Sequence, residues 1–386
     1  MTNRYHHYRT LLLVLCAAIG SAKVAHAQSA FAGKICVNKT SKVLTVRSRC
    51  KSNETLLKDQ QSLTGPKGAT GATGAAGTDG SIRIYGDGSA GPLNITSGFN
   101  NLVSDNPQFT TCNVSAEAIL NVPSGTTIRC TEGVTIAGTI SVGQSAIGGV
   151  YNSTASSNVY TASLLPPHPG VSKQVASSGE IGAAGATLKG GKHGYSAVSG
   201  IAESFLWHAP WGGGGGGASQ GAGGAGGGSL LILAKGPVDI TGLISAGAVL
   251  GSQGGGGGAG GVIFVASQTG VTLQSPGLIA ASGADGGAST AGAAAGGGGA
   301  GGYVRIISPS NSVDAARITV QGGPAGSSTT QISNTVAIAG GAGGSCLEGG
   351  GTGGDVGLGR PASSSGATSG SSGISIVTTA DPTSLF

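Results

Sequence analysis

The chain has 386 residues, of which 78 are glycine, 9% are charged and 38% are hydrophobic. Soluble domains average about 7% glycine and about 25% charged residues. The hydrophobic content excludes a chain kept disordered by charge, and glycine falls short of the one third that collagen needs throughout. An ordinary helical enzyme is also disfavoured, because interior glycine costs a helix about 1 kcal/mol relative to alanine.

Residues 1–27 have the pattern of a secretory signal peptide. Arg4 and Arg9 precede an apolar run over 11–19, and Ala25-His26-Ala27 supplies the small residues of a cleavage site. The alternative is an uncleaved anchor, but the apolar run is shorter than the roughly 20 residues that span a bilayer. We therefore expect cleavage before Gln28, no later membrane span, and a secreted, extracellular or cell-surface location.

The net charge of +5 is unevenly distributed. The signal-like segment 1–27 carries three cations and no acid, which leaves +2 (5 − 3) for the rest. Residues 28–80 hold eight Lys/Arg and three Asp/Glu, a net of +5, whereas residues 81–386 hold nine and twelve, a net of −3. This distribution gives no reason to expect nucleic-acid binding.

Five cysteines follow the signal sequence. Cys36 with Cys50 and Cys112 with Cys130 form two close pairs, which predict two disulfides in an oxidising compartment. Cys346 is left over, either free or paired between chains. No Cys/His cluster has the spacing of a metal site, so no metal and no cofactor are expected.

Residues 28–64 form a small basic module. The β-prone runs 34–39 and 43–47 predict a hairpin, Cys50 can return to Cys36, and residues 50–57 are expected to lead out of the module. The letters I-C-V-N-K, a short strand, C-K-x-x-E-T-x-L and a collagen-like stretch together resemble an N-terminal module of many exported bacterial proteins.

Residues 65–80 are five G-x-y triplets and a closing glycine. Only glycine fits at the axis of a triple helix, so this period admits a collagen-like stalk that joins three chains into a homotrimer. A flexible Gly/Thr/Ala spacer without trimerisation is the role we expect, and the trimerising stalk is the alternative.

Residues 81–360 alternate short β runs with glycine. Runs that begin at Leu230, Ile263 and Val304 recur at similar intervals along the chain, and V-D-I-T-G-L-I-S-A at 238–246 matches V-T-I-A-G-T-I-S-V at 134–142. Short repeated strands must stack on their neighbours to bury an apolar face. We therefore predict an all-β protein, a right-handed parallel β-helix, followed by a Ser/Gly-rich tail over 361–386.

The sequence separation of Cys112 and Cys130 is close to one coil of such a helix, which predicts the two cysteines side by side on adjacent rungs. The motifs F-T-x-C-x-V, V-P-S-G-T-x-I-x-C and V-x-I-x-G-x-I-S-x, with the tracts G-G-G-G-x-G-G-x-(I/V/L), resemble glycine-rich exported bacterial proteins of the pectin-lyase-like β-helix type. The resemblance implies architecture, and the catalytic signature of the pectin-degrading enzymes is missing from the sequence.

The long glycine tracts within 212–302 admit two interpretations. Ordering glycine is entropically costly, so we expect loops that are only partly ordered. The alternative is a set of packed polyglycine-II rods, which would resemble the glycine-rich tips of some phage and bacterial adhesins. Asp87 and Asp285, each beside glycine, are expected in turns rather than in calcium loops.

Residues 192–211 contain both tryptophans of the chain. A hydrophobic cover over the solenoid is the expected role of this segment. A patch that binds a ligand is the alternative, with Tyr195, Trp207 and Trp211 as its candidate residues.

These observations predict a secreted or surface-exposed structural or adhesive protein whose β-helix binds a glycan or a surface. We expect no enzyme activity, because Glu117, Glu132, Asp239, Asp285 and Asp314 do not share a repeat position. A polysaccharide lyase or hydrolase on the same scaffold and an elastic coat protein without a specific ligand are the alternatives.

Overall fold

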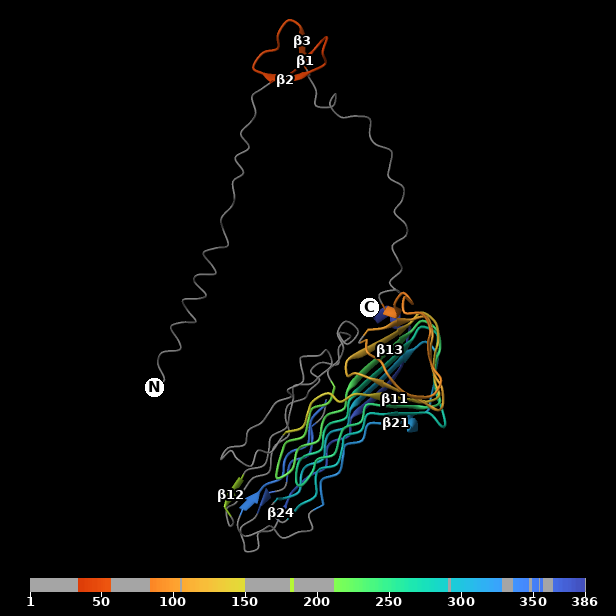
Figure 1. Ribbon diagram of the computed structural model, residues 1–386, viewed down its shortest axis with the longest axis vertical. Coiled ribbons are helices and arrows are strands. Elements are labelled where there is room, and N and C mark those ends of the chain that lie inside the picture. Colours follow the sequence, from red (N-terminus) through yellow and green to blue (C-terminus); the bar gives the residue numbers. More distant parts are fainter. Residues whose placement is uncertain are drawn as a thin grey trace, which may run out of the picture. The chain divides into compact units, whose positions relative to one another are not determined.

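The computed structural model describes residues 34–56, 84–104, 106–149, 181–183, 212–290, 293–327, 336–346, 349–353, 355–356 and 364–385 (Figure 1). The chain divides into two compact units, Met1–Gly77 and Thr78–Phe386. No helix in the described ranges is long and apolar enough to cross a membrane.

The first unit is a three-stranded antiparallel sheet in the order β2-β1-β3. Its strands are β1 (Lys34–Asn38), β2 (Leu44–Arg47) and β3 (Glu54–Leu56). The predicted hairpin is confirmed, with Ile35 opposite Val46. Strand β3 corrects the expectation that residues 50–57 lead out of the module, because it returns to pair with the other edge of β1. The predicted disulfide Cys36–Cys50 is present, with 5.5 Å between its Cα atoms.

The second unit is built on three parallel sheets of six strands each. Successive strands enter the three sheets in turn, so each coil gives one strand to each sheet, which is the arrangement of a parallel β-helix.

Sheet 1 contains β4 (Leu93–Ile95), β7 (Cys112–Val114), β10 (Val134–Ile136), β14 (Val238–Ile240), β17 (Val271–Leu273) and β20 (Asn311–Val313). Sheet 2 contains β5 (Gly98–Asn101), β8 (Ala118–Val122), β11 (Thr139–Val142), β15 (Leu243–Ser245), β18 (Leu278–Ala280) and β21 (Ile318–Thr319). Sheet 3 contains β6 (Gln108–Phe109), β9 (Thr126–Cys130), β13 (Ser229–Ala234), β16 (Val262–Ser267), β19 (Tyr303–Ser308) and β25 (Ile374–Thr379).

Four further strands and two short 3-10 helices complete the described elements. They are the antiparallel pairs β12 (Ile181–Ala183) with β22 (Val336–Ile338) and β23 (Asp355–Val356) with β24 (Ser364–Ser365), and the helices η3 (Ala315–Arg317) and η4 (Pro382–Leu385).

The predicted repeat corresponds to neighbouring coils. Leu230 lies opposite Ile263, and Ile263 lies opposite Val304. The two matching nine-residue runs are also neighbours, because Val134 lies opposite Val238. Sequence similarity at this spacing therefore identified strands that are hydrogen-bonded to each other.

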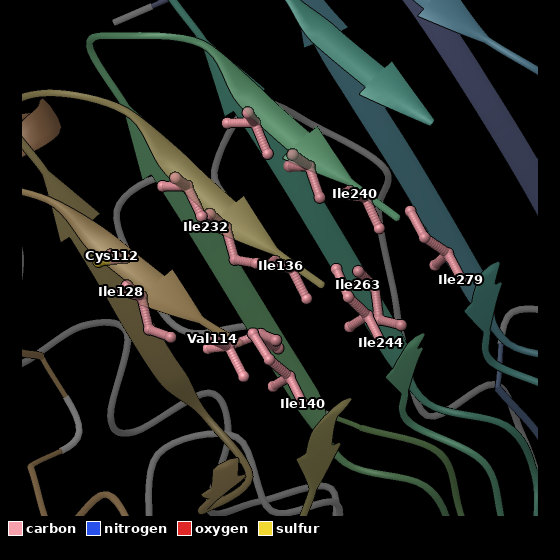
Figure 2. Packing of buried hydrophobic residues seen from close by; sticks show 14 of the residues in the cluster. Cys112, Val114, Ile128, Ile136, Ile140, Ile232, Ile240, Ile244, Ile263 and Ile279 are labelled. Carbon is pink, nitrogen blue, oxygen red and sulfur yellow. The ribbon is translucent and has the colours of Figure 1, made fainter. Parts of the chain in front are cut away.

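The core is a stack of inward-facing aliphatic side chains. Ile128, Ile232 and Val265 form one column from coil to coil, and each is at most 2% exposed. Figure 2 labels Ile128 and Ile232 among the buried side chains of this core. The inward residues alternate along each strand with outward ones, as in β10, where Val134 and Ile136 are buried and Thr135 is exposed. Full burial of one such aliphatic side chain contributes about 1.5–3 kcal/mol.

The disulfide Cys112–Cys130 is present, but its predicted position is wrong. Both cysteines belong to one coil, in β7 of sheet 1 and β9 of sheet 3, and their Cα atoms are 6.7 Å apart. The rung partner of Cys112 in the next coil is Val134, which lies beyond Cys130 in the sequence. The separation of the two cysteines is thus shorter than a full coil, and the disulfide joins the first and last strands of the same coil.

Candidate functional site: a flat uncharged face and its glycine-rich frame

The connections from sheet 2 to sheet 3 are long in the last four coils. They cover 143–228, 246–261, 281–302 and 320–373, and they hold the glycine tracts. In Figure 1 the described parts of these connections leave the strands as extended chains that run beside one another.

The tract 254–261 has hydrogen-bonded neighbours on six sides. Its successive N–H groups donate to three tracts, 212–218, 294–302 and 246–252, as in Gly256 to Gly217, Gly257 to Gly297 and Gly258 to Val249. Its carbonyl groups accept from three others, 221–228, 281–289 and 338–346. The N···O distances are 2.7–3.0 Å, and each neighbour is contacted again three residues later. A three-residue repeat of extended backbone is the geometry of a polyproline-II-type helix, so this is a hexagonal polyglycine-II bundle.

Close packing of backbones, rather than unusual dihedral angles, requires the glycine. A Cβ on Gly256 would lie 1.8 Å from the carbonyl oxygen of Ala342, and one on Gly257 would lie 2.0 Å from that of Ala284. Neither glycine has a positive φ, whereas Gly254 at the start of the tract does, at 79°. The described tracts are therefore packed rods, which corrects our expectation of partly ordered loops.

Beside this bundle, the outer face of sheet 2 carries two straight columns of side chains. We call these residues the sheet 2 face. The first column is Phe99, Ile119, Thr139, Leu243 and Leu278, which lie opposite one another from strand to strand. The second column is Asn101, Asn121, Ser141, Ser245, Ala280 and Thr319.

None of the residues in these two columns is charged, and none is buried. The first column ends at Leu278, because the next residue in register is Arg317, which is ion-paired with Asp314 at the edge of the face. Phe99 is 79% exposed, and the other residues of the first column are half-buried. The residues between them, such as Leu120 and Ile140, point into the core and are at most 2% exposed. The face therefore presents one mainly apolar column and one column of small, mostly hydrogen-bonding groups, on a rigid sheet whose strands are about 4.8 Å apart.

The other two sheets differ in their outer faces. The outward column of sheet 1 is polar and includes a carboxylate: Asn94, Asn113, Thr135, Asp239, Thr272 and Ser312. The outward Leu231, Leu233 and Phe264 of sheet 3 are buried, and they pack with Ile84 and Tyr85 from before the first coil. Burial raises the pKa of the Tyr85 hydroxyl, and the charge of Asp381 raises it further. Sheet 2 is therefore the sheet that exposes apolar side chains in a row.

The predicted aromatic candidates Tyr195, Trp207 and Trp211 lie outside the described residues. The sheet 2 face was not predicted from the sequence. The sequence feature that marks part of this face is the repeated G-x-I-S-x run. Its second position points outward, and Thr139 and Leu243 occupy that position in two neighbouring coils. Alternation alone marks that position as outward but does not tell which sheet stays uncovered.

The acidic residues of the described ranges do not form a metal site, since no group of three or more His, Cys, Asp or Glu side chains comes together there. Asp87 lies in a turn, as predicted, and hydrogen bonds from Ser89 lower the pKa of its carboxyl group. Asp285 corrects the matching prediction, because it lies exposed on the extended tract 281–289 rather than in a turn. Asp314 accepts a hydrogen bond from the Ala316 N–H and caps η3.

Comparisons of the chain with protein families, with characterised proteins and with solved structures gave no match.

Proposed function

We propose that this is a secreted or cell-surface structural and adhesive protein that binds a neutral surface or glycan through the sheet 2 face. The observation that carries the proposal is the uncharged pair of columns running across the coils. A neutral, ordered partner fits such a face, because binding it leaves no protein charge desolvated and unpaired.

The two columns suit the surface of a sugar chain. Sugars present C–H groups that pack on apolar side chains, and hydroxyl groups that exchange hydrogen bonds with Ser, Thr and Asn. Three of the coils, through β5, β8 and β15, offer one position of each kind, so a partner with repeating units makes the same contact more than once. Such multivalent binding can be far tighter than a single contact.

The rest of the chain supports export and display. Two disulfides are typical of an oxidising compartment, and residues 1–27 resemble a signal peptide. In this proposal the solenoid is a right-handed parallel β-helix, since crossovers between parallel strands are right-handed in about 98% of cases. The G-x-y run over 65–80 serves as the spacer between the module and the solenoid.

The proposal is tested by placing charge on one face and not on another. We expect Leu243→Lys with Leu278→Lys to lower binding of the secreted protein to insoluble neutral polysaccharides and to a glycan array by tenfold or more. Thr135→Lys with Thr272→Lys adds the same charge to the outer face of sheet 1, and we expect binding to change by less than about twofold.

Two further outcomes decide between sites. Equal binding by both lysine variants and the unaltered protein would remove the sheet 2 face as the binding surface. If Trp207→Ala with Trp211→Ala abolished binding instead, the site would lie in the aromatic segment. Failure of the unaltered protein to bind any glycan or surface would favour a coat protein without a specific ligand.

A further inference from the structure

One face of the N-terminal sheet is apolar and open. Ile35 and Val37 of β1 lie directly opposite Val46 and Leu44 of β2, so these four side chains share a face. Leu44 is 52% exposed and Val46 is 53% exposed. We call Ile35, Val37, Leu44 and Val46 the module face.

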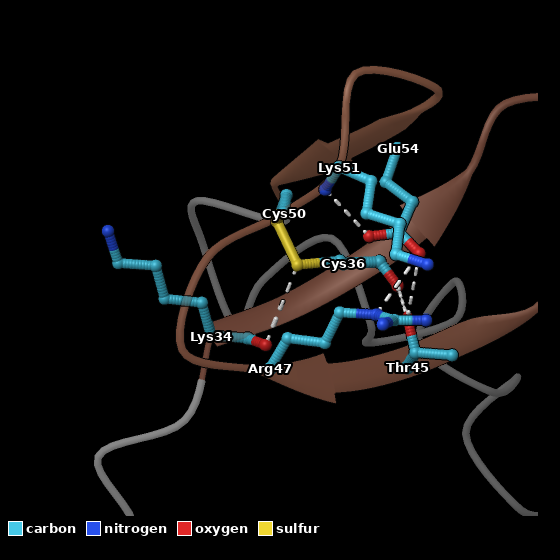
Figure 3. Close-up of a disulfide and its surroundings, with 7 residues drawn as sticks. All are labelled: Lys34, Cys36, Thr45, Arg47, Cys50, Lys51 and Glu54. Carbon is cyan, nitrogen blue, oxygen red and sulfur yellow. Dashed lines mark hydrogen bonds and ion pairs between the residues drawn. A yellow bond between two sulfur atoms is a disulfide. The ribbon is translucent and has the colours of Figure 1, made fainter.

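The opposite face of the same sheet is already occupied. It carries the disulfide Cys36–Cys50 and the ion pair between Arg47 and Glu54, with 3.3 Å between Nε and Oε1 (Figure 3). Glu54 also accepts the N–H of Lys51 at 2.9 Å. One face of the sheet thus carries the disulfide and the polar contacts, and the other face carries the exposed aliphatic side chains.

A single sheet with one exposed apolar face has no second layer that buries this face. Stable domains bury the apolar face of a sheet against a second layer. Domains below about 40 residues usually need disulfides, metals or oligomerisation to be stable. The described part of the module, residues 34–56, has one disulfide and no second layer.

We propose that the module face is a self-association surface, covered by the same face of further copies of this chain. The sequence supplies the means to bring the copies together. The G-x-y run begins at Gly65, shortly after β3 ends at Leu56, and a collagen-like helix joins three chains. Chains tethered this closely meet at a high effective concentration, so a small apolar patch is enough.

The charge distribution fits a partner of the same kind. The module is strongly basic, yet the module face contains no charged residue. The cross-strand pair Lys34 and Arg47 belongs to the face that carries the disulfide. Copies that meet through the module face therefore avoid placing their cations in the centre of the contact.

The test is the mass of the full secreted protein in solution, by sedimentation equilibrium at micromolar concentration. We expect a trimer, and we expect Leu44→Lys with Val46→Lys to shift it to lower mass. Ser41→Lys with Ser48→Lys adds the same charge at exposed positions outside the module face and is expected to leave the trimer intact.

The fold of each variant is checked by mass spectrometry without reductant, which reports whether the Cys36–Cys50 disulfide has formed. A monomeric unaltered protein would overturn the proposal. A trimer that persists in the Leu44/Val46 variant would overturn it as well, because association would then rest on the spacer alone. Glycan binding is measured on the same samples, so loss of association and loss of the sheet 2 face function are distinguished.

Discussion

At the scale of single residues, glycine has two distinct roles in this protein. Glycines such as Gly125 and Gly98 have a positive φ and allow turns between strands. Those in the bundle have ordinary extended backbones, and what matters there is the missing side chain. Some positions in the bundle tracts carry alanine instead of glycine. Two of them, Ala259 and Ala300, lie near the ends of their tracts, where their methyl groups pack with Val262 and Tyr303 in a small apolar cluster.

A matched pair of substitutions separates these roles. In Gly257→Ala the new Cβ meets backbone at 2.0 Å, whereas in Gly247→Ala the nearest atom is 3.7 Å away. We expect Gly257→Ala to destabilise the protein by about 1–3 kcal/mol or more, because backbones must move apart. Gly247→Ala is expected to be neutral or to stabilise by about 0.4–1 kcal/mol, through a less flexible unfolded chain. Thermal and denaturant unfolding measure both, and equal effects would contradict the close packing.

At the scale of elements, the three-stranded sheet depends on one carboxylate. The Glu54 side chain is 4% exposed, and it accepts hydrogen bonds from the Lys51 N–H and the Thr45 hydroxyl. The Lys51 N–H is the main cause of its lowered pKa, and the charge of Arg47 adds to it.

This lowered pKa predicts how the sheet responds to acid. Because the folded pKa lies below the unfolded one, ionised Glu54 stabilises the sheet at pH values above the unfolded pKa of about 4.3. That stabilisation is lost as the pH falls through the folded pKa. We expect amide exchange in residues 34–56, corrected for the intrinsic pH effect, to lose protection on acidification. In Glu54→Gln, the amides of residues 34–56 should be less protected from exchange at neutral pH and should lose little further protection on acidification. If this variant showed the same pH profile as the unaltered protein, Glu54 would not be the group responsible.

The strands of the solenoid were predictable, and the bundle was not. Alternation and a repeated nine-residue run located β10, β11, β14 and β15 because a half-buried strand dictates both. Strand β3 was missed since only three residues pair, beside an already complete hairpin. Packed polyglycine rods and glycine-rich loops have the same amino-acid composition. Which of the two forms depends on whether other tracts lie close enough to hydrogen-bond, and the sequence does not show this. Which outer face stays open depends likewise on distant segments, such as Ile84 and Tyr85 over sheet 3.

At the scale of the whole second unit, the solenoid and the bundle are one structure. The tracts 246–252 and 281–289 continue from strands of sheet 2, and the tracts 221–228, 254–261 and 294–302 enter strands of sheet 3, so stacking of the coils also places these tracts in their lattice. The tracts 221–228 and 254–261 run parallel, as do the strands β13 and β16 that follow them. We infer that the lattice and the sheets form cooperatively.

The bundle also sets the thermal behaviour of the protein. Its interior consists of peptide groups, and exposing polar surface lowers the heat capacity, whereas exposing apolar surface raises it. Unfolding should therefore show a heat-capacity change below the usual value of about 12–15 cal/mol/K per residue, measurable by scanning calorimetry. A smaller change flattens the dependence of stability on temperature, so the fold should lose little of its stability in the cold. We therefore expect the polyglycine interior to keep the protein folded about as firmly in cold water as in warm water.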